Sequence, residues 1–213
     1  APLYNESYYE SCDALLAISK QTENINKLVL GDKAKNKIIA YVPHGINEKI
    51  FFPVDVDNSE YGNLQTMKKS LYGDKNFEYI IFYNARNIRR KCVSDLIAAY
   101  QVFVDGLTDE QAAKCALVLH TQTVDENGTD LVAVKDLLCN ERSNIIFSNN
   151  RISSHELNLL YNLSDVVVLP SSNEGWGLSL TEAMMCGKMI IANVTGGMQD
   201  QMRFENEKGE WIK

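Results

Sequence analysis

The stretch Val166-Val-Val-Leu-Pro-Ser-Ser-Asn-Glu-Gly-Trp-Gly-Leu-Ser-Leu-Thr-Glu182 passes from an apolar run, through a glycine-rich loop, into a helical pattern. Such an apolar run is typical of a central parallel strand that is buried on both faces. In open parallel sheets, ligands bind at the carboxyl ends of the strands, beside the N-termini of the following helices. The loop that contains Glu174 is therefore expected at a binding edge.

Short β-branched runs alternate with helical patterns from about residue 78 onward, as is typical of βαβ units on a parallel sheet. The expected strands are Tyr79–Tyr83, Ala116–His120, Asn144–Phe147, Val166–Leu169 and Met189–Ala192. The expected helices are Ser94–Val104, Thr129–Leu138, Ser154–Leu163 and Leu178–Cys186. The predicted fold class is α/β, with a Rossmann-like parallel sheet that carries helices on both faces.

The first 50 residues follow a different pattern, with a strand-like Leu15–Ser19, a helical Gln21–Leu30 and a strand-like Ile38–Val42. The polar stretch Pro53–Gly73 is predicted to be a linker or surface excursion. The last residues, Gly209–Lys213, are predicted to begin a strand. We therefore expect the chain to be incomplete at both ends.

Composition excludes several classes of protein. The 213 residues carry a formal net charge of −7, so binding to nucleic acid through a basic face is not expected. The five cysteines are scattered and show no C-x-x-C spacing, which predicts neither a disulfide framework nor a zinc site. No apolar run reaches 18 residues, and reduced thiols are the simpler interpretation, so we expect a cytoplasmic protein.

Glu174 and Glu182 flank the expected start of a helix, with Glu182 about 6 Å further along at about 1.5 Å per residue. The backbone amides near Gly177 and Leu178 lie between them and are able to meet a phosphate at the positive end of the helix. A nucleotide sugar has the matching order of sugar, diphosphate and ribose. Ionised carboxylates accept hydrogen bonds from the hydroxyl groups at both ends of such a ligand.

Two carboxylates beside a diphosphate require cations from elsewhere. The segment Asn84-Ala-Arg-Asn-Ile-Arg-Arg-Lys91 follows the first strand of the expected sheet, at the same edge. Arg86 suits a phosphate as a bidentate fork, and Lys91 suits it as a point charge. Such cations also stabilise a diphosphate as it leaves.

These residues resemble a known family. Glu174 to Glu182 is similar to the E-x7-E motif of retaining GT-B glycosyltransferases, in its family 4 form (glycosyl transferases group 1). Further segments occur in the order of that family: Asp13–Ser19, Val42–Asn47 with Phe52-Pro53, Arg86–Lys91, Glu156-Leu157 with Ser164-Asp165, and Gly196-Gly197. The resemblance extends over nearly the whole chain.

The resemblance implies roles for individual residues. Arg86 and Lys91 bind the donor diphosphate and act with Glu174 in catalysis. Glu174 and the amides of Gly175, Trp176, Gly177 and Leu178 hold the donor, Glu182 binds the ribose, and the backbone at Arg151 and Ile152 faces the base. The implied reaction is transfer of a sugar to an acceptor hydroxyl with retention of configuration, without a metal or another cofactor.

The resemblance also implies domains and partners. Residues 1–52 are expected to form the end of an N-terminal GT-B domain and the connection, residues 53–77 a linker, and residues 78–213 the C-terminal donor-binding domain. The expected donor is a UDP- or GDP-sugar, and the acceptor is a glycan, lipid or protein in glycan biosynthesis. Peripheral contact with the cytosolic face of a membrane is expected through the N-terminal domain.

The chain departs from the family pattern at three positions, where Ala85 and Cys92 stand in place of glycine and Asp200 stands where glutamate is frequent. The replacements at Ala85 and Cys92 are expected to stiffen the phosphate loop or to make the fit to phosphate poorer.

Alternatives remain open. A glycoside hydrolase also uses two carboxylates but has no need of Arg86 and Lys91. A dinucleotide-dependent oxidoreductase would show G-x-G-x-x-G after the first strand, which reads Asn84-Ala-Arg-Asn-Ile-Arg89 instead. The remaining rival is a nucleotide-sugar-binding module without turnover. Trp176 suits core packing and sugar contact equally well.

Overall fold

The computed structural model describes residues 6–202, 206–208 and 210. The chain divides into two compact units. The larger unit comprises Ile46–Ser172 and Ser179–Asn193, and the smaller unit comprises Ala1–Gly45, Asn173–Leu178 and Val194–Lys213. The domain boundaries expected from the sequence, after residues 52 and 77, stay predictions.

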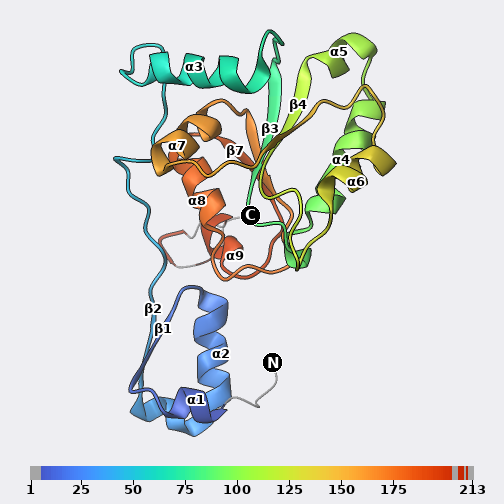
Figure 1. Ribbon diagram of the computed structural model, residues 1–213. Coiled ribbons are helices and arrows are strands. Elements are labelled where there is room, and N and C mark those ends of the chain that lie inside the picture. Colours follow the sequence, from blue (N-terminus) through green and yellow to red (C-terminus); the bar gives the residue numbers. More distant parts are fainter. Residues whose placement is uncertain (1–5, 203–205, 209, 211–213) are drawn as a thin grey trace. The chain divides into compact units, whose positions relative to one another are not determined.

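A five-stranded parallel sheet forms the centre of the larger unit, with strand order β5-β4-β3-β6-β7 (Figure 1). Its strands are β3 (Tyr79–Asn84), β4 (Cys115–His120), β5 (Ile145–Ser148), β6 (Val166–Leu169) and β7 (Met189–Ala192). The chain builds β3, β4 and β5 outward in one direction and then returns to place β6 on the other side of β3. The reversal between β3 and β6 is the topological switch point, where parallel sheets of this kind bind ligands.

Helices cover both faces of this sheet. In Figure 1, α4 and α6 lie on one side and α7 and α8 on the other. The helices of the larger unit are α3 (Tyr61–Tyr72), α4 (Val93–Asp105), α5 (Asp109–Ala113), α6 (Leu131–Leu138), α7 (Ser154–Asn162) and most of α8 (Leu178–Met185), with the short 3-10 helix η3 (Arg89–Lys91). The predicted α/β class with a Rossmann-like sheet is therefore confirmed.

Burial explains why the strands form where they do. All four residues of β6 are buried, and so are the first five residues of β4, as expected for strands covered on both faces. Side chains of Phe82, Val167, Tyr161 and Ala183 pack together in the core between the sheet, α7 and α8. This core fixes the strands whose carboxyl ends carry the candidate site.

The predicted bounds of β6 and β7 agree with the structure, and the other predicted elements of this unit differ from it by one or two residues. Helix α6 begins at Leu131 because the Asp130 side chain accepts hydrogen bonds from the amides of Val132 and Ala133, each at 3.1 Å. Ser153 and Glu156 form a capping box at the start of α7.

The structure contains a helix that the sequence did not predict. The stretch Pro53–Gly73, predicted to be a linker or surface excursion, contains the twelve-residue helix α3. Leu64 and Tyr72 of this helix are buried, and Met67 and Leu71 pack against the core. Apolar side chains at helical spacing therefore tie the segment to the larger unit, although its polar residues suggested a connection.

The smaller unit contains α1 (Glu6–Glu10), β1 (Ala14–Ala17), α2 (Lys20–Leu30), the 3-10 helix η2 (Gly31–Asn36), β2 (Ile38–Tyr41) and α9 (Met198–Met202). Strands β1 and β2 pair in parallel, with Ala14 opposite Ile38. Ser19 caps α2 by accepting a hydrogen bond from the Thr22 amide at 3.0 Å. Apart from Glu210, the strand predicted for 209–213 lies outside the described residues.

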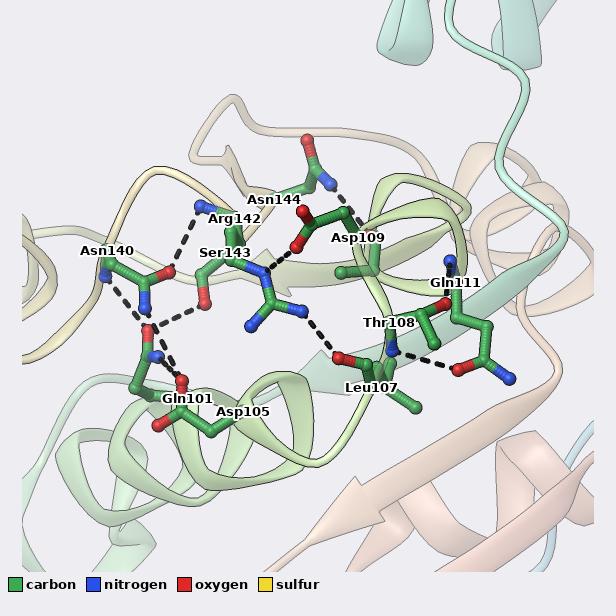
Figure 2. Close-up of polar contacts among 11 residues, drawn as sticks. Gln101, Asp105, Leu107, Thr108, Asp109, Gln111, Asn140, Arg142, Ser143 and Asn144 are labelled. Carbon is green, nitrogen blue, oxygen red and sulfur yellow. Dashed lines mark hydrogen bonds and ion pairs between the residues drawn. The ribbon is translucent and has the colours of Figure 1, made fainter.

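A polar cluster lies beside the amino ends of β4 and β5 (Figure 2). We call it the amino-edge network and define it as Gln101, Asp105, Asn140, Arg142 and Ser143. Gln101 Oε1 accepts from the Asn140 amide at 2.9 Å and from Ser143 Oγ at 2.8 Å, while its Nε2 donates to Asp105 Oδ1 at 2.7 Å. Arg142 Nη2 donates to the carbonyl of Leu107 at 2.5 Å, so the network links α4, the turn before α5 and the turn before β5.

Candidate functional site

The loop after β3 carries the cations expected to bind phosphate. The Arg86 guanidinium forms a fork with Asp125, at 2.6 Å from Nε to Oδ2 and 3.1 Å from Nη2 to Oδ1. These hydrogen bonds raise the pKa of Arg86 and lower that of Asp125. The Arg86 side chain remains 59% exposed, and a guanidinium has five N–H donors, so its contact with Asp125 leaves donors for a ligand.

Lys91 lies in η3 and is half-buried. Its predicted contact with a diphosphate stays a prediction. The carbonyl of Arg90, in the same 3-10 helix, accepts a hydrogen bond from the Ser172 amide at 2.8 Å. This bond joins the loop after β3 to the loop after β6, so the two loops at the switch point are fixed to each other.

Cys92 ends η3 and precedes α4 with φ 54° and ψ 39°, in the left-handed region. Among the described residues it is the only non-glycine residue with positive φ. A side chain costs free energy in this conformation, whereas glycine adopts it freely. Cys92 therefore places backbone strain next to the cationic loop, at a position where the resemblance predicted a departure from glycine.

An open pocket of about 300 Å³ lies at the carboxyl ends of β3, β4 and β5. Its lining includes Arg86 from the loop after β3, Gln122 from the loop after β4, and Arg151 and Ile152 from the loop after β5. The structure thus brings together three residues that the sequence assigned to one ligand, namely Arg86 for phosphate and Arg151 with Ile152 for the base. A volume of this size lies at the lower end of the range for small-molecule sites.

Two further lining residues were not predicted to belong to a site. His120 Nδ1 lies 3.0 Å from Ser148 Oγ, across the ends of β4 and β5, and burial lowers the pKa of His120. Thr121 is also buried, and its hydroxyl has no hydrogen-bond partner in the part of the chain that the structure describes. The position of both residues at the carboxyl end of a predicted strand was the signal that could have identified them.

Glu182 lies about one turn inside α8 and is half-buried. Its Oε2 accepts a hydrogen bond of 2.6 Å from the hydroxyl of Tyr161 in α7, and that hydroxyl accepts one of 2.9 Å from Asn84 Nδ2 at the end of β3. Burial raises the pKa of Glu182, and the bond from Tyr161 opposes this effect. Because Asn84 also lines the pocket, hydrogen bonds connect Glu182 to the pocket wall.

The segment Glu174–Leu178 belongs to the smaller unit, where glycines allow close backbone contacts. The Gly197 amide donates to the Glu174 carbonyl at 3.1 Å, and a Cβ at Gly196 would collide with that carbonyl. A Cβ at Gly175 would lie 2.9 Å from Ile18 Cδ1. The Gly196-Gly197 pair and Gly175 are therefore explained by packing around the Glu174 backbone.

Trp176 and Gly177 complete this segment. The Trp176 ring is buried and meets His44 edge-on at 6.3 Å between centroids, and its carbonyl accepts from Gln201 Nε2 at 2.5 Å. Gly177 has φ 88°, which a side chain rarely adopts. In α9, Asp200 Oδ2 accepts from the Lys20 amide at 2.8 Å, at the start of α2. The roles expected for Glu174 to Leu178 toward a donor sugar stay predictions.

Two other kinds of feature, a metal-binding cluster and a membrane-spanning helix, are absent from the described residues. They contain no group of three or more histidine, cysteine, aspartate or glutamate residues with a geometry that suits a metal ion. No helix in the described ranges has the length and apolar character needed to cross a membrane.

Comparisons with known proteins identify relatives of this chain. The chain is 30% identical over 194 residues to N-acetyl-alpha-D-glucosaminyl L-malate synthase of Bacillus anthracis. The aligned region covers 90% of this chain and 44% of that enzyme. It thus spans less than half the length of this relative.

Solved structures show the same fold. HepE of Anabaena, crystallised with UDP-glucose, superimposes with a TM-score of 0.66 at 16% identity and covers 91% of this chain and 48% of its own. The catalytic domain of starch synthase IV from Arabidopsis thaliana, bound to ADP and acarbose, gives a TM-score of 0.66 at 15% identity. The superposition covers 95% of this chain and 43% of the starch synthase chain. Both likenesses concern the fold alone.

A family profile matches more than half of the chain. Residues 68–213 match the family described as Glycosyl transferases group 1, and this range contains every strand of the larger unit's sheet, the cationic loop and both glutamates. The chain belongs to the glycosyl transferases group 1 family.

Proposed function

We propose that this chain binds the donor in a glycosyltransferase that moves a sugar from a nucleoside diphosphate to an acceptor hydroxyl, with retention of anomeric configuration. The observation that carries the proposal is the pocket at the carboxyl ends of β3, β4 and β5, where Arg86 and the Arg151–Ile152 segment line one cavity and hydrogen bonds lead from its wall to Glu182. A positive charge for phosphate and a carboxylate for ribose hydroxyls are the groups that a nucleoside diphosphate requires.

Each predicted residue has a role in this reaction. Arg86 and Lys91 bind the diphosphate and stabilise the charge that develops on it as the glycosidic bond breaks. Glu182 accepts hydrogen bonds from the ribose, and the backbone at Arg151 and Ile152 contacts the base. Glu174 and the amides of Gly175 to Leu178 hold the sugar. The reaction needs neither a metal nor a further cofactor.

The donor base is proposed from the relatives. HepE was crystallised with UDP-glucose and starch synthase IV with ADP, so the same fold holds either a pyrimidine or a purine in those proteins. A UDP-sugar is the first donor to test, followed by GDP- and ADP-sugars. The acceptor is a hydroxyl of a small molecule, glycan, lipid or protein.

Thermal-shift titration tests donor binding directly. At one hundred times its dissociation constant a ligand stabilises the folded state by about 2.7 kcal/mol, which raises the melting temperature by about 5–10 °C for this size of protein. We expect that shift with one of UDP, GDP or ADP, and we expect Glu182→Ala to reduce it. Glu141→Ala, an exposed residue before β5, is the matched control and should retain it. The absence of a shift with every nucleotide would contradict the proposal.

Transfer is tested separately. With the nucleotide sugar that binds, we expect release of the nucleoside diphosphate in the presence of a chelator and, by proton NMR, a product with the anomeric configuration of the donor. Inversion of configuration or loss of activity with the chelator would contradict the corresponding part of the proposal. Binding without transfer would favour a nucleotide-sugar-binding module without turnover.

A further inference from the structure

Tyr161 connects three elements at the switch point although its side chain is completely buried. Its ring lies edge-on to Phe82 of β3 at 5.2 Å and to Phe51 at 6.0 Å between centroids, which fixes the position of the ring. Its hydroxyl donates to Glu182 Oε2 at 2.6 Å and accepts from Asn84 Nδ2 at 2.9 Å. Both the donor and an acceptor of the phenol are therefore engaged in defined directions.

The arrangement constrains Glu182 more than a surface carboxylate would be constrained. A hydrogen bond from a neutral phenol to a carboxylate is short and strong, and it favours the ionised form of the acid. Burial and the adjacent Glu182 raise the pKa of Tyr161 well above its ordinary value, so the phenol keeps its proton and remains a donor. Only Oε2 of Glu182 takes part in this bond. The position of Oε1 is then fixed as well, because the carboxylate is planar and one torsion about the Cγ–Cδ bond sets both oxygens.

We propose that Tyr161 is a positioning residue for ribose recognition: its hydroxyl holds the Glu182 carboxylate in the orientation that receives the ribose hydroxyls of a nucleoside diphosphate. The inference rests on the proposed function, which assigns the ribose to Glu182. Asn84 contributes by fixing the phenol from the wall of the pocket, and the Asn84 backbone is itself held by Ser179 Oγ of α8 at 2.7 Å from its carbonyl.

The test compares the affinity for UDP, or for whichever nucleoside diphosphate binds the wild-type chain, with the affinity for its 2′,3′-dideoxy counterpart. A hydrogen bond to a charged group implies that the wild-type chain prefers the ribonucleotide by about 10-fold to 100-fold. Tyr161→Phe should weaken ribonucleotide binding by about 10-fold and leave dideoxynucleotide binding nearly unchanged, since only the ribonucleotide uses the oriented carboxylate.

Three controls separate positioning from general structural support. Tyr100→Phe alters a buried tyrosine in α4 whose hydroxyl has no hydrogen-bond partner among the described residues, and it should leave the preference unchanged. In a Glu182→Ala background, Tyr161→Phe should have no further effect on the preference. If Tyr161→Phe does not fold, Asn84→Ala, which removes the bond that orients the phenol, should lower the preference instead.

The outcomes distinguish the two hypotheses. Equal weakening of ribonucleotide and dideoxynucleotide binding by Tyr161→Phe would overturn the positioning role, while the proposed function would stand. A preference that persists in Tyr161→Phe would overturn it as well. If the wild-type chain binds no nucleoside diphosphate, the proposed function fails and the inference fails with it.

Discussion

Two arginines at opposite ends of the same sheet pair with aspartates, and their surroundings differ. At the amino edge, Arg142 Nε lies 2.8 Å from Asp109 Oδ1, and the Arg142 side chain is 28% exposed. At the carboxyl edge, Arg86 pairs with Asp125 and is 59% exposed. The amino-edge network joins its side chains to one another and to nearby backbone groups, as Figure 2 shows. Arg86 instead lines an open pocket.

This difference shows that polar side chains at strand ends do not by themselves indicate a ligand site. In the amino-edge network, Gln101 is buried and its amide oxygen accepts two hydrogen bonds, so the network stabilises the fold. At the carboxyl edge, Cys92 has a strained backbone, the carboxylate of Glu182 is half-buried, and the exposed guanidinium of Arg86 lines the open pocket. Such features cost stability and are concentrated at functional sites.

The largest effect is expected from breaking the amino-edge network. Gln101→Ala would leave the buried Ser143 hydroxyl and the Asn140 amide without their acceptor, at a cost of about 2–3 kcal/mol. The melting temperature should fall by about 5–10 °C. Nucleotide affinity, measured by calorimetry well below the transition, should remain that of the wild type. A large loss of affinity would show that the two edges are not independent.

The two arginines provide a matched pair for the next prediction. Arg86→Ala should weaken nucleoside diphosphate binding by about 10-fold to 100-fold, because charge-assisted bonds to phosphate are lost, and should change the melting temperature little. Arg142→Ala should do the reverse, since it removes the bond to the Leu107 carbonyl at a cost of about 1–2 kcal/mol while the pocket is untouched. Calorimetry and thermal denaturation of both variants measure the contrast.

A reversed or uniform result would contradict this comparison. If Arg86→Ala lowered stability as much as Arg142→Ala without affecting affinity, the pair with Asp125 would be structural, and the assignment of Arg86 to phosphate would be wrong.

The sequence predicts an element well when the signal for it lies in residues that are close together in the chain. The strands Val166–Leu169 and Met189–Ala192 were predicted correctly because short apolar runs of this kind are local signals. Helix α3 was missed because Leu64, Met67 and Leu71 form only a narrow apolar stripe among polar residues. The polar composition of Pro53–Gly73 led to its interpretation as a linker or surface excursion.

The sequence predicted which loops form the candidate site, and it did not predict the side-chain contacts within it. The meeting of Arg86 with Arg151 and Ile152 followed from topology, since the carboxyl ends of parallel strands share one edge. The fork between Arg86 and Asp125 and the bond between Tyr161 and Glu182 join residues 39 and 21 positions apart. These contacts depend on loop conformation and side-chain packing, which no local pattern specifies.

A smaller effect is expected at Cys92. A non-glycine residue in the left-handed region costs about 1–2 kcal/mol, and part of the gain from glycine is offset by the flexibility of the unfolded chain. Cys92→Gly should therefore stabilise the chain by about 0.5–1 kcal/mol, or about 1–4 °C in melting temperature. Cys92→Ala removes the thiol but keeps Cβ, so it should give no gain. Equal stabilisation by both variants would assign the effect to the thiol and not to backbone strain.

The smallest effect concerns pH and distinguishes the edges by their titrating groups. Burial lowers the pKa of His120 at the carboxyl edge, so between that pKa and the unfolded value of about 6.5 the unfolded chain binds more protons than the folded chain. His120 therefore reduces stability as pH falls below about 6.5 and contributes nothing to this dependence at higher pH.

The comparison of melting temperatures from pH 8 to pH 5 tests this sign. The wild type should lose more stability than His120→Asn below pH 6.5, and the two curves should run parallel above pH 7. Gln101→Ala provides the control at the other edge, because the amino-edge network contains no group that titrates near neutrality. The difference in melting temperature between Gln101→Ala and the wild type should be constant with pH.

Since His120 meets Ser148 at the pocket, a bound nucleotide that buries the imidazole further should enlarge the difference between His120→Asn and the wild type. If His120→Asn and the wild type lose stability in parallel down to pH 5, the folded and unfolded chains bind protons equally at His120, and the lowered pKa of His120 would be wrong.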